Sequence, residues 1–305
     1  MNRLVLIDGH ALVFRAYYAF PATLTDKEGK QINAVYGFAS MLLTIIKELH
    51  PEFMAVAFDM EKPTFRHLEF VGYKAQRPEV DVELINQLDG VKDLVKNLNI
   101  PIFGVEGFEG DDVIGTLARQ AKDVETVIVT GDKDALQLIE DKKVLVYVPG
   151  RGKIPARIYD EAAVEEKLGV KPVQVTDLKA LMGDSSDNIK GVAGVGPKTA
   201  AELVKKYGSI EKIYEHVEEL PEKLKQKMVD GFEEAHRSKH LVTIVTDVPI
   251  TLNLEACRIC DYNQKKAEQL FEKWGFKSLI KKLPPSAKAS AGQASRESQI
   301  SLFDK

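Results

Sequence analysis

The sequence contains only two cysteines, Cys257 and Cys260, which is too few for a disulfide framework. Their Cys-x-x-Cys spacing has no second Cys/His pair nearby to complete a four-ligand zinc site, so we interpret it as incidental. No apolar run approaches the roughly 18 residues that a membrane-spanning helix needs. The opening MNRLVLIDGH is a short strand-like run without the apolar core and cleavage site of a signal peptide. These absences favour a cytoplasmic protein with no membrane partner.

The sequence also has little excess of either charge, since its net charge is only −4. This total conceals a grouping of acids along the chain. Nine carboxylates form the constellation described below, and without them 42 basic side chains would face 37 acidic ones. If the nine acids hold divalent cations, the remaining surface is free to be basic toward phosphate. The net charge therefore does not exclude a nucleic-acid partner.

Apolar runs and helical periodicities alternate through the first half of the chain. The apolar runs predict buried parallel strands over 3–8, 52–59 and 125–132. Apolar residues recur at helical spacing over 33–49, 81–98 and 111–123. With 44% hydrophobic residues, the chain can fill one large or two ordinary cores. The alternation predicts an α/β fold with a mainly parallel central sheet flanked by helices.

The pattern becomes helical and richer in lysine from about residue 175. We expect an α/β core over 1–175 and a helical subdomain over 176–283. The composition shifts to Pro, Ser, Ala, Gly and Lys over 284–305, which predicts a flexible tail or linker. Within the subdomain, 240–254 is a candidate strand that returns to the sheet, and 261–275 predicts a further helix.

Three predicted strands each end in an aspartate, at Asp8, Asp59 and Asp132. In open parallel sheets, ligands bind in the crevice beyond the carboxyl ends of the strands. The alternative for any one of them is an ordinary turn, because Asp favours turns after strands. Three acids delivered to one edge favour a binding site.

Further acids complete the constellation: Glu109, Asp111, Asp112, Asp134, Asp184 and Asp187. Mg²⁺ and Mn²⁺ prefer carboxylate and water ligands. Two such ions roughly 3.5–4 Å apart support in-line displacement at phosphorus. Taken singly, each cluster has an alternative as a helix N-terminus, an Asx-rich turn or a loop neutralised by Lys133. Taken together, the nine acids predict a site for two Mg²⁺ or Mn²⁺ ions.

The segment GVAGVGPKTA at 191–200 is rich in glycine and begins a helix with a lysine. Glycines let a backbone approach phosphate closely, and free N–H groups at a helix start bind it. Helices flank the segment on both sides, so it is neither a Walker A loop nor a dinucleotide fingerprint. We interpret it as a backbone grip on nucleic acid, with an ordinary αα-hairpin as the alternative.

The segment 63–79 interleaves basic and aromatic side chains. Such a mixture suits a nucleic-acid strand threaded past phosphates with base stacking. The alternative is a solvated amphipathic helix.

Eight motifs follow one another in the order found in bacterial 5′ nucleases: LIDGHALVFRAYYA, AVYGFA, FDMEKPTFRH, YKAQRPE, EGDDVIGTLA, TGDKDALQL, LMGDSSDNI and GVGPKTA. From residue 3 to about 280 the chain resembles the 5′→3′ exonuclease/flap endonuclease domain of DNA polymerase I and its free-standing relatives. The resemblance implies a PIN-like core, a helical arch at about 63–90 and a helix-three-turn-helix at about 176–220. Gly110 departs from the family, which usually has Ala there.

The same resemblance implies a metal-dependent phosphodiesterase that acts on 5′ ends, flapped or branched DNA and RNA–DNA primer junctions in replication and repair. It assigns all nine acids to two metal ions, as direct ligands or through water, with Asp8, Asp59 and Asp132 central to catalysis. It places Lys74 and Arg66 at the scissile phosphate. Further DNA-binding residues that it implies are Arg15, Tyr17, Arg77, Gly191, Gly194, Gly196, Lys198 and Thr199. The turn at 191–196 is also a candidate K⁺ site.

Some alternatives stay open. The proofreading and polymerase domains are absent from this sequence, so the chain is either a free-standing nuclease or a domain of a polymerase. Residues 299–303 resemble the short peptide that docks on the sliding clamp, or form a solubilising terminus. A branched-DNA-binding module with vestigial chemistry would need a broken metal site, and no acid is missing. An RNase of similar core is disfavoured by the glycine turn.

Overall fold

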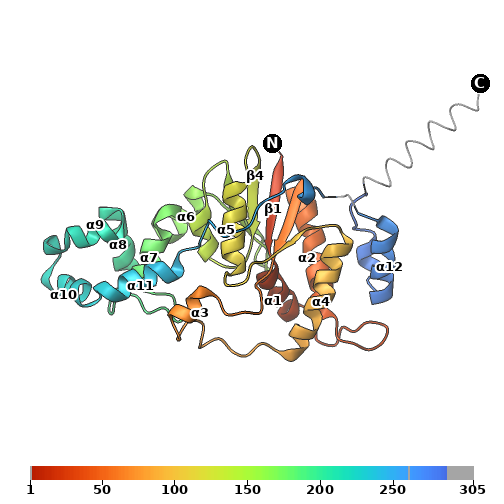
Figure 1. Ribbon diagram of the computed structural model, residues 1–305, viewed down its shortest axis with the longest axis horizontal. Helices are drawn as coiled ribbons and strands as arrows, with labels where there is room; N and C mark the ends of the chain where they lie inside the picture. Colours follow the sequence, from red (N-terminus) through yellow and green to blue (C-terminus); the bar gives the residue numbers. More distant parts are fainter. Residues whose placement is uncertain (1, 260–261, 287–305) are drawn as a thin grey trace, which may run out of the picture.

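The computed structural model describes residues 2–259 and 262–286. The predicted clamp peptide and Cys260 lie outside these residues. A six-stranded sheet forms the centre of the molecule, in the order β3-β2-β1-β4-β5-β6 (Figure 1). All neighbouring strands are parallel except β6, which pairs antiparallel with β5. The strand bounds are β1 Arg3–Asp8, β2 Phe53–Ala57, β3 Ile102–Phe103, β4 Glu125–Val129, β5 Val144–Val148 and β6 Arg157–Tyr159.

The central strands of the sheet, β1, β2 and β4, are buried on both faces. In β1, Leu4 and Leu6 point into one apolar cluster, and Val5 and Ile7 point into the other. Strands covered on both sides need continuous apolar sequence, which explains the uninterrupted runs. The three predicted strands are confirmed, and β3, β5 and β6 add to them at the edges. None of the helices in the described residues is long and apolar enough to cross a membrane.

Helices cover the two faces unequally. One face packs against α1 (Gly9–Ala19), α2 (Asn33–Leu49), α4 (Val82–Asn97) and α12 (Gln264–Trp274), followed by α13 (Lys277–Ile280). The other face packs against α5 (Gly110–Gln120). The helix predicted over 33–49 has those bounds in α2, which ends at His50 in the left-handed conformation.

The helical subdomain extends from one side of the sheet, away from α12 (Figure 1). The core ends with α6 Glu161–Leu168, and the helices of the subdomain are α7 Val175–Met182, α8 Pro197–Tyr207, α9 Ile210–Glu215, α10 Glu222–Asp230 and α11 Phe232–Val242. Short 3-10 helices complete the fold at η1 Asp134–Leu138, η2 Pro172–Gln174, η3 Val217–Glu219 and η4 Glu255–Cys257. In the predicted arch, only α3 (Phe65–Glu69) is helical before turns at 71–77, and helix resumes with α4.

The expectation that 240–254 returns to the sheet as a strand is wrong. After α11 this segment runs without strand pairing along α5. Three of its backbone N–H groups bind side chains spaced four residues apart on α5: Val245 N donates to Asp112 Oδ1 (2.8 Å), Val248 N to Thr116 Oγ1 (3.1 Å) and Leu252 N to Gln120 Oε1 (2.8 Å). A helix surface therefore takes the place of a strand partner.

Candidate metal and nucleic-acid site

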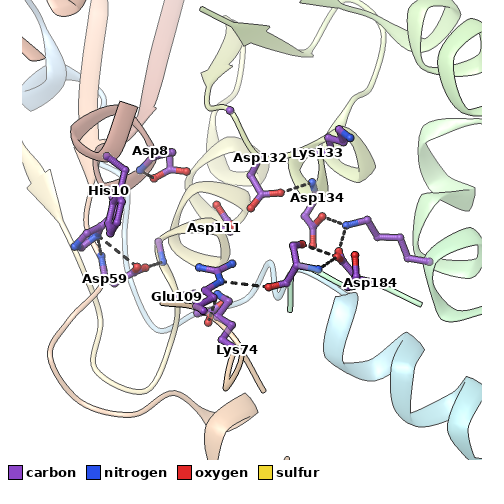
Figure 2. Close-up of a pocket in the computed structure, with 18 of the residues that line it drawn as sticks. Asp8, His10, Asp59, Lys74, Glu109, Asp111, Asp132, Lys133, Asp134 and Asp184 are labelled. Atoms are coloured by element: carbon purple, nitrogen blue, oxygen red, sulfur yellow. Dashed lines mark hydrogen bonds and ion pairs between the residues drawn. The ribbon is translucent and has the colours of Figure 1, made fainter. Parts of the chain in front are cut away.

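An open pocket of about 940 Å³ lies at the carboxyl edge of the sheet. Seven of the nine predicted acids line it: Asp8, Asp59, Glu109, Asp111, Asp132, Asp134 and Asp184. Figure 2 shows Asp8 and Asp59 on one side and Asp134 and Asp184 on the other, with Asp111 and Asp132 between them. Basic side chains on the wall are His10, Lys74, Arg77, Lys133 and Lys179.

Asp8 is held by the fold on both of its oxygens. It is the last residue of β1 and caps α1, because its Oδ1 accepts the Ala11 amide at 2.9 Å. Its Oδ2 accepts the Thr130 hydroxyl at 2.8 Å. Thr130 Oγ1 also accepts the amide of Asp132 at 3.0 Å, so one threonine couples the ends of β1 and β4.

Asp59 links the end of β2 to the start of α5. Its Oδ1 accepts the Gly110 amide at 2.6 Å, and its own amide donates to His10 Nδ1 at 3.0 Å. A Cβ on Gly110 would stand 3.2 Å from Asp59 Oδ1, which is a tight contact. The glycine that departs from the family pattern thus gives the Asp59 carboxylate room. Burial lowers the pKa of His10, which favours the neutral ring that accepts this hydrogen bond.

The carboxylates in the centre of the pocket are electrostatically strained. Burial, and then repulsion from Asp59 and Asp132, raises the pKa of Asp8 to about 6, although hydrogen bonds from Ala11 and Thr130 lower it. Burial raises the pKa of Asp111 well above its ordinary value, and repulsion from four neighbouring carboxylates adds to it. A hard divalent cation would stabilise the charged form of both carboxylates, so the donor set fits Mg²⁺ or Mn²⁺. Among the described residues, no three His, Cys, Asp or Glu side chains are already arranged around a common point that could hold a metal ion.

Asp112 and Arg66 are predicted at the metal ions and the scissile phosphate, but neither lines the pocket. They lie directly behind Glu109, whose Oε2 is 3.6 Å from Arg66 Nη1. Arg66 Nη1 and Nη2 bind Asp112 Oδ2 and Oδ1 at 2.7 and 2.8 Å, with side chains only 3% and 0% exposed. Arg66 also donates to the carbonyls of Leu241 and Thr243. Asp112 Oδ2 accepts a hydrogen bond from the backbone amide of Glu109, and this contact is part of the cap at the start of α5. The pair therefore joins α3, the start of α5 and the end of α11 beside the pocket.

Asp187 is a second predicted ligand that does not line the pocket. It is buried, and its carboxylate receives Arg77 Nη2 at 2.6 Å and the Tyr73 hydroxyl at 3.1 Å. Tyr73 also lies 3.1 Å from Glu109 Oε2, and Lys74 Nζ donates to Glu109 Oε1 at 2.7 Å. The backbone of Lys74 is left-handed, with φ 54°, and its amide donates to the Asp187 carbonyl. These contacts fasten the 71–77 turns to the 184–189 loop.

Lys179 is a pocket residue that the sequence analysis missed. It lies in α7 and is only 8% exposed, and its ammonium binds both Asp134 and Asp184, the latter at 2.5 Å. A basic residue in the last turn of a helix, five positions before Asp184, was the available signal. His10, which directly follows the Asp8-Gly9 pair, is another lining residue that the sequence pattern did not indicate.

Two predicted DNA-binding residues face other parts of the fold. Arg15 donates to the carbonyls of Pro149, at 2.7 Å, and Gly150, in the hairpin between β5 and β6. The Tyr17 hydroxyl donates to Asp81 Oδ2 at 2.6 Å. Neither lines the pocket.

The glycine turn between α7 and α8 adjoins the pocket through the 183–190 loop. Gly191 and Gly194 have φ of 64° and 76°, which side chains rarely adopt. At Gly191 a Cβ would also stand 2.3 Å from the backbone nitrogen of Gly183. Gly196 is extended and precedes α8, where Lys198 is exposed and Thr199 partly buried.

Comparison with known proteins assigns the family. The family model described as "5'-3' exonuclease, N-terminal resolvase-like domain" matches residues 3–169. A second, described as "5'-3' exonuclease, C-terminal SAM fold", matches residues 170–265. The chain belongs to the 5′-3′ exonuclease family. The family membership predicted from the sequence motifs is therefore confirmed.

Curated relatives of this family member are DNA polymerases I. That of Chloroflexus aurantiacus is 42% identical over 98% of this chain and 34% of the relative. That of Bacillus subtilis is 41% identical over 96% of this chain and 34% of the relative. The chain thus spans about a third of the length of these relatives.

Solved structures confirm the predicted fold. The T5 D15 protein co-crystallised with metal ions superposes with a TM-score of 0.66 at 24% identity, covering 89% of this chain and 99% of that one. The catalytic core of Rad2 in complex with a DNA substrate superposes with a TM-score of 0.56 at 16% identity, covering 92% of each chain. At these identities the likeness concerns the fold alone.

Proposed function

We propose that this 5′-3′ exonuclease family member is a structure-specific 5′ nuclease. Its substrates would be 5′ ends and 5′ flaps of branched DNA, together with RNA primers on DNA, in replication and repair. The observation that carries the proposal is the convergence of Asp8, Asp59 and Asp132, from three strands, with Asp111 of α5 in one open pocket. Such a set of carboxylates serves metal-assisted hydrolysis of phosphodiesters.

The proposed cofactors are two Mg²⁺ or Mn²⁺ ions. The acids that line the pocket would hold the ions. Asp112 and Asp187 would not bind them directly, and would instead orient Glu109 and Arg77 through hydrogen bonds. When bound, such ions supply Lewis acidity and neutralise the charge that develops at phosphorus. The T5 D15 protein, which shares the fold, was co-crystallised with metal ions.

The chain's own residues would orient the substrate. Lys74 lies on the pocket wall with its ammonium on Glu109, within reach of a phosphate that enters the pocket. The backbone of Lys74 is left-handed, which is unfavourable for a residue other than glycine. Strained backbone conformations of this kind are often found where a functional side chain must be held in one position. The turn at 191–200 would hold the duplex through its backbone and Lys198, without reading sequence.

We propose the same division of the chain as the sequence predicts, into an α/β core over 1–175 and a DNA-binding subdomain over 176–283. The curated relatives support an attached polymerase as the natural context, with the clamp peptide at 299–303 as a further candidate contact.

A labelled 5′-flap DNA tests the proposal. We expect cleavage near the junction in Mg²⁺, with 5′-phosphate and 3′-hydroxyl ends, and none in chelator. Single-stranded RNA of the flap sequence is the matched substrate control. Binding without turnover in Mg²⁺ would favour a tethering module, and preferential cleavage of the RNA would favour an RNase; either result contradicts the proposal.

A further inference from the structure

The glycine turn offers a direct test of the K⁺ site that the family resemblance implies. A monovalent cation on such a turn is held by backbone carbonyl oxygens that point outward. Here the carbonyl of Val192 accepts the Val195 amide at 3.0 Å, and that of Gly196 accepts the Ala200 amide at 2.9 Å. The carbonyl of Gly194, between them, accepts the ammonium of Lys227 at 2.9 Å.

The backbone of Lys227 is held close to the turn by the packing of α10. Its neighbour Met228 is fully buried, and the Tyr214 hydroxyl donates to the Met228 carbonyl at 3.0 Å. Gly231, which ends α10, lies against Val192 of the turn so closely that a Cβ there would stand 2.8 Å from Val192 Cγ1. The side chain of Lys227 therefore leaves a helix end that already contacts the turn.

Gly194 leaves space for this ammonium. A Cβ at this position would stand 2.9 Å from Lys227 Nζ and 3.1 Å from its Cε. The absence of a side chain at Gly194 thus permits both the left-handed backbone and the approach of Lys227. A potassium ion on the Gly194 carbonyl would meet a unit positive charge at contact distance, which is repulsive. The turn in this conformation does not fit the ion.

We infer that the ammonium of Lys227 takes the place of a monovalent cation at this turn, so that duplex binding does not require K⁺. This inference rests on the proposed role of the turn in holding duplex DNA. An ammonium has three N–H donors, and within residues 2–259 and 262–286 Gly194 accepts one of them, so the others would be free to bind a backbone phosphate. The positive charge becomes part of the polypeptide instead of being recruited from solution.

Duplex binding tests the inference. The affinity of the full chain for a labelled duplex is measured by fluorescence anisotropy in chelator. Potassium is compared with tetramethylammonium, which is too large for a carbonyl site, at equal ionic strength. We expect the wild-type dissociation constants to agree within about twofold, once the general salt effect is held constant. Binding that is more than about fivefold tighter in potassium would overturn the inference. No duplex binding in any salt would instead refute the proposed role of the turn, and the inference with it.

Two substitutions on α10 sharpen the test. Lys227→Met removes the ammonium and keeps an unbranched side chain that is one atom shorter. Lys223→Met makes the same charge change one turn earlier on α10. We expect Lys227→Met to weaken binding in tetramethylammonium more than Lys223→Met does, and potassium to restore part of the loss. Equal behaviour of the two variants in both salts would contradict the inference. Thermal unfolding of both variants checks that they fold. If one does not fold, the wild-type comparison of the two salts still tests the inference, because it uses no variant.

Discussion

Arg66 and Asp112, 46 positions apart in the chain, form a bidentate ion pair with N–O distances of 2.7 and 2.8 Å in the interior of the protein. The pair joins α3, at the base of the predicted arch, to the first turn of α5. Through the carbonyls of Leu241 and Thr243 it also holds the end of α11. It therefore connects three segments around the pocket without entering it.

Removing one partner of this pair is expected to destabilise the fold. Arg66→Ala leaves the Asp112 carboxylate buried without its counter-charge, which costs about 3–5 kcal/mol of unfolding free energy. Lys62→Ala is the control, because Lys62 and Glu106 form an exposed pair that is worth about 0–1 kcal/mol. Urea denaturation of both variants measures the difference. Equal stabilities would show that the buried pair contributes no more than the exposed one.

The stability of the metal-free protein is expected to fall as the pH rises from about 4 to about 6. The pKa of Asp8 is raised from 3.8 to about 6 in the fold, so in this window the folded state binds more protons than the unfolded state. The stabilisation by protonation is complete below the unfolded pKa and is lost as the pH passes the folded pKa. Denaturation in chelator across this range checks the slope. Asp8→Asn should reduce it, and Asp111, whose pKa is also raised, accounts for a remaining part of the same sign. A slope unchanged by Asp8→Asn would assign it to other groups.

Divalent metal is expected to raise the thermal unfolding temperature at neutral pH, because it neutralises the repelling carboxylates. Asp132→Ala should weaken this stabilisation and slow flap cleavage by at least about 100-fold, the scale of losing one charge-stabilising group in an active site. Calorimetric scans with and without Mg²⁺ provide a readout independent of cleavage. Full activity and an unchanged metal response in Asp132→Ala would remove this residue from the metal site.

Lys74 is expected to affect chemistry more than binding. Lys74→Ala should reduce single-turnover cleavage by about 100-fold or more, while duplex affinity changes only slightly, because it would remove the charge that we propose acts on the reacting phosphate. Lys133→Ala is the matched control: Lys133 also lines the pocket but is exposed. If both variants cleave at similar rates, the contact between Lys74 and Glu109 has only a structural role.

The sequence predicted those features that depend on local pattern. Uninterrupted apolar runs mark strands buried on both faces, and the carboxyl ends of parallel strands share one edge, so the convergence of Asp8, Asp59 and Asp132 followed from their positions alone. The bounds of α2 likewise followed from its helical periodicity. The order of the eight motifs indicated the family.

Only the tertiary structure decided which of these side chains meet. Sequence spacing does not say that Asp112 turns away from Asp111 toward Arg66, or that the ammonium of Lys179 lies between Asp134 and Asp184. The apolar alternation over 240–254 is the same for a strand in a sheet and for an extended segment on a helix, and the side chains of α5 selected the second. Local pattern determines which face of an element is apolar, whereas the partner of a polar side chain depends on segments brought together only by folding.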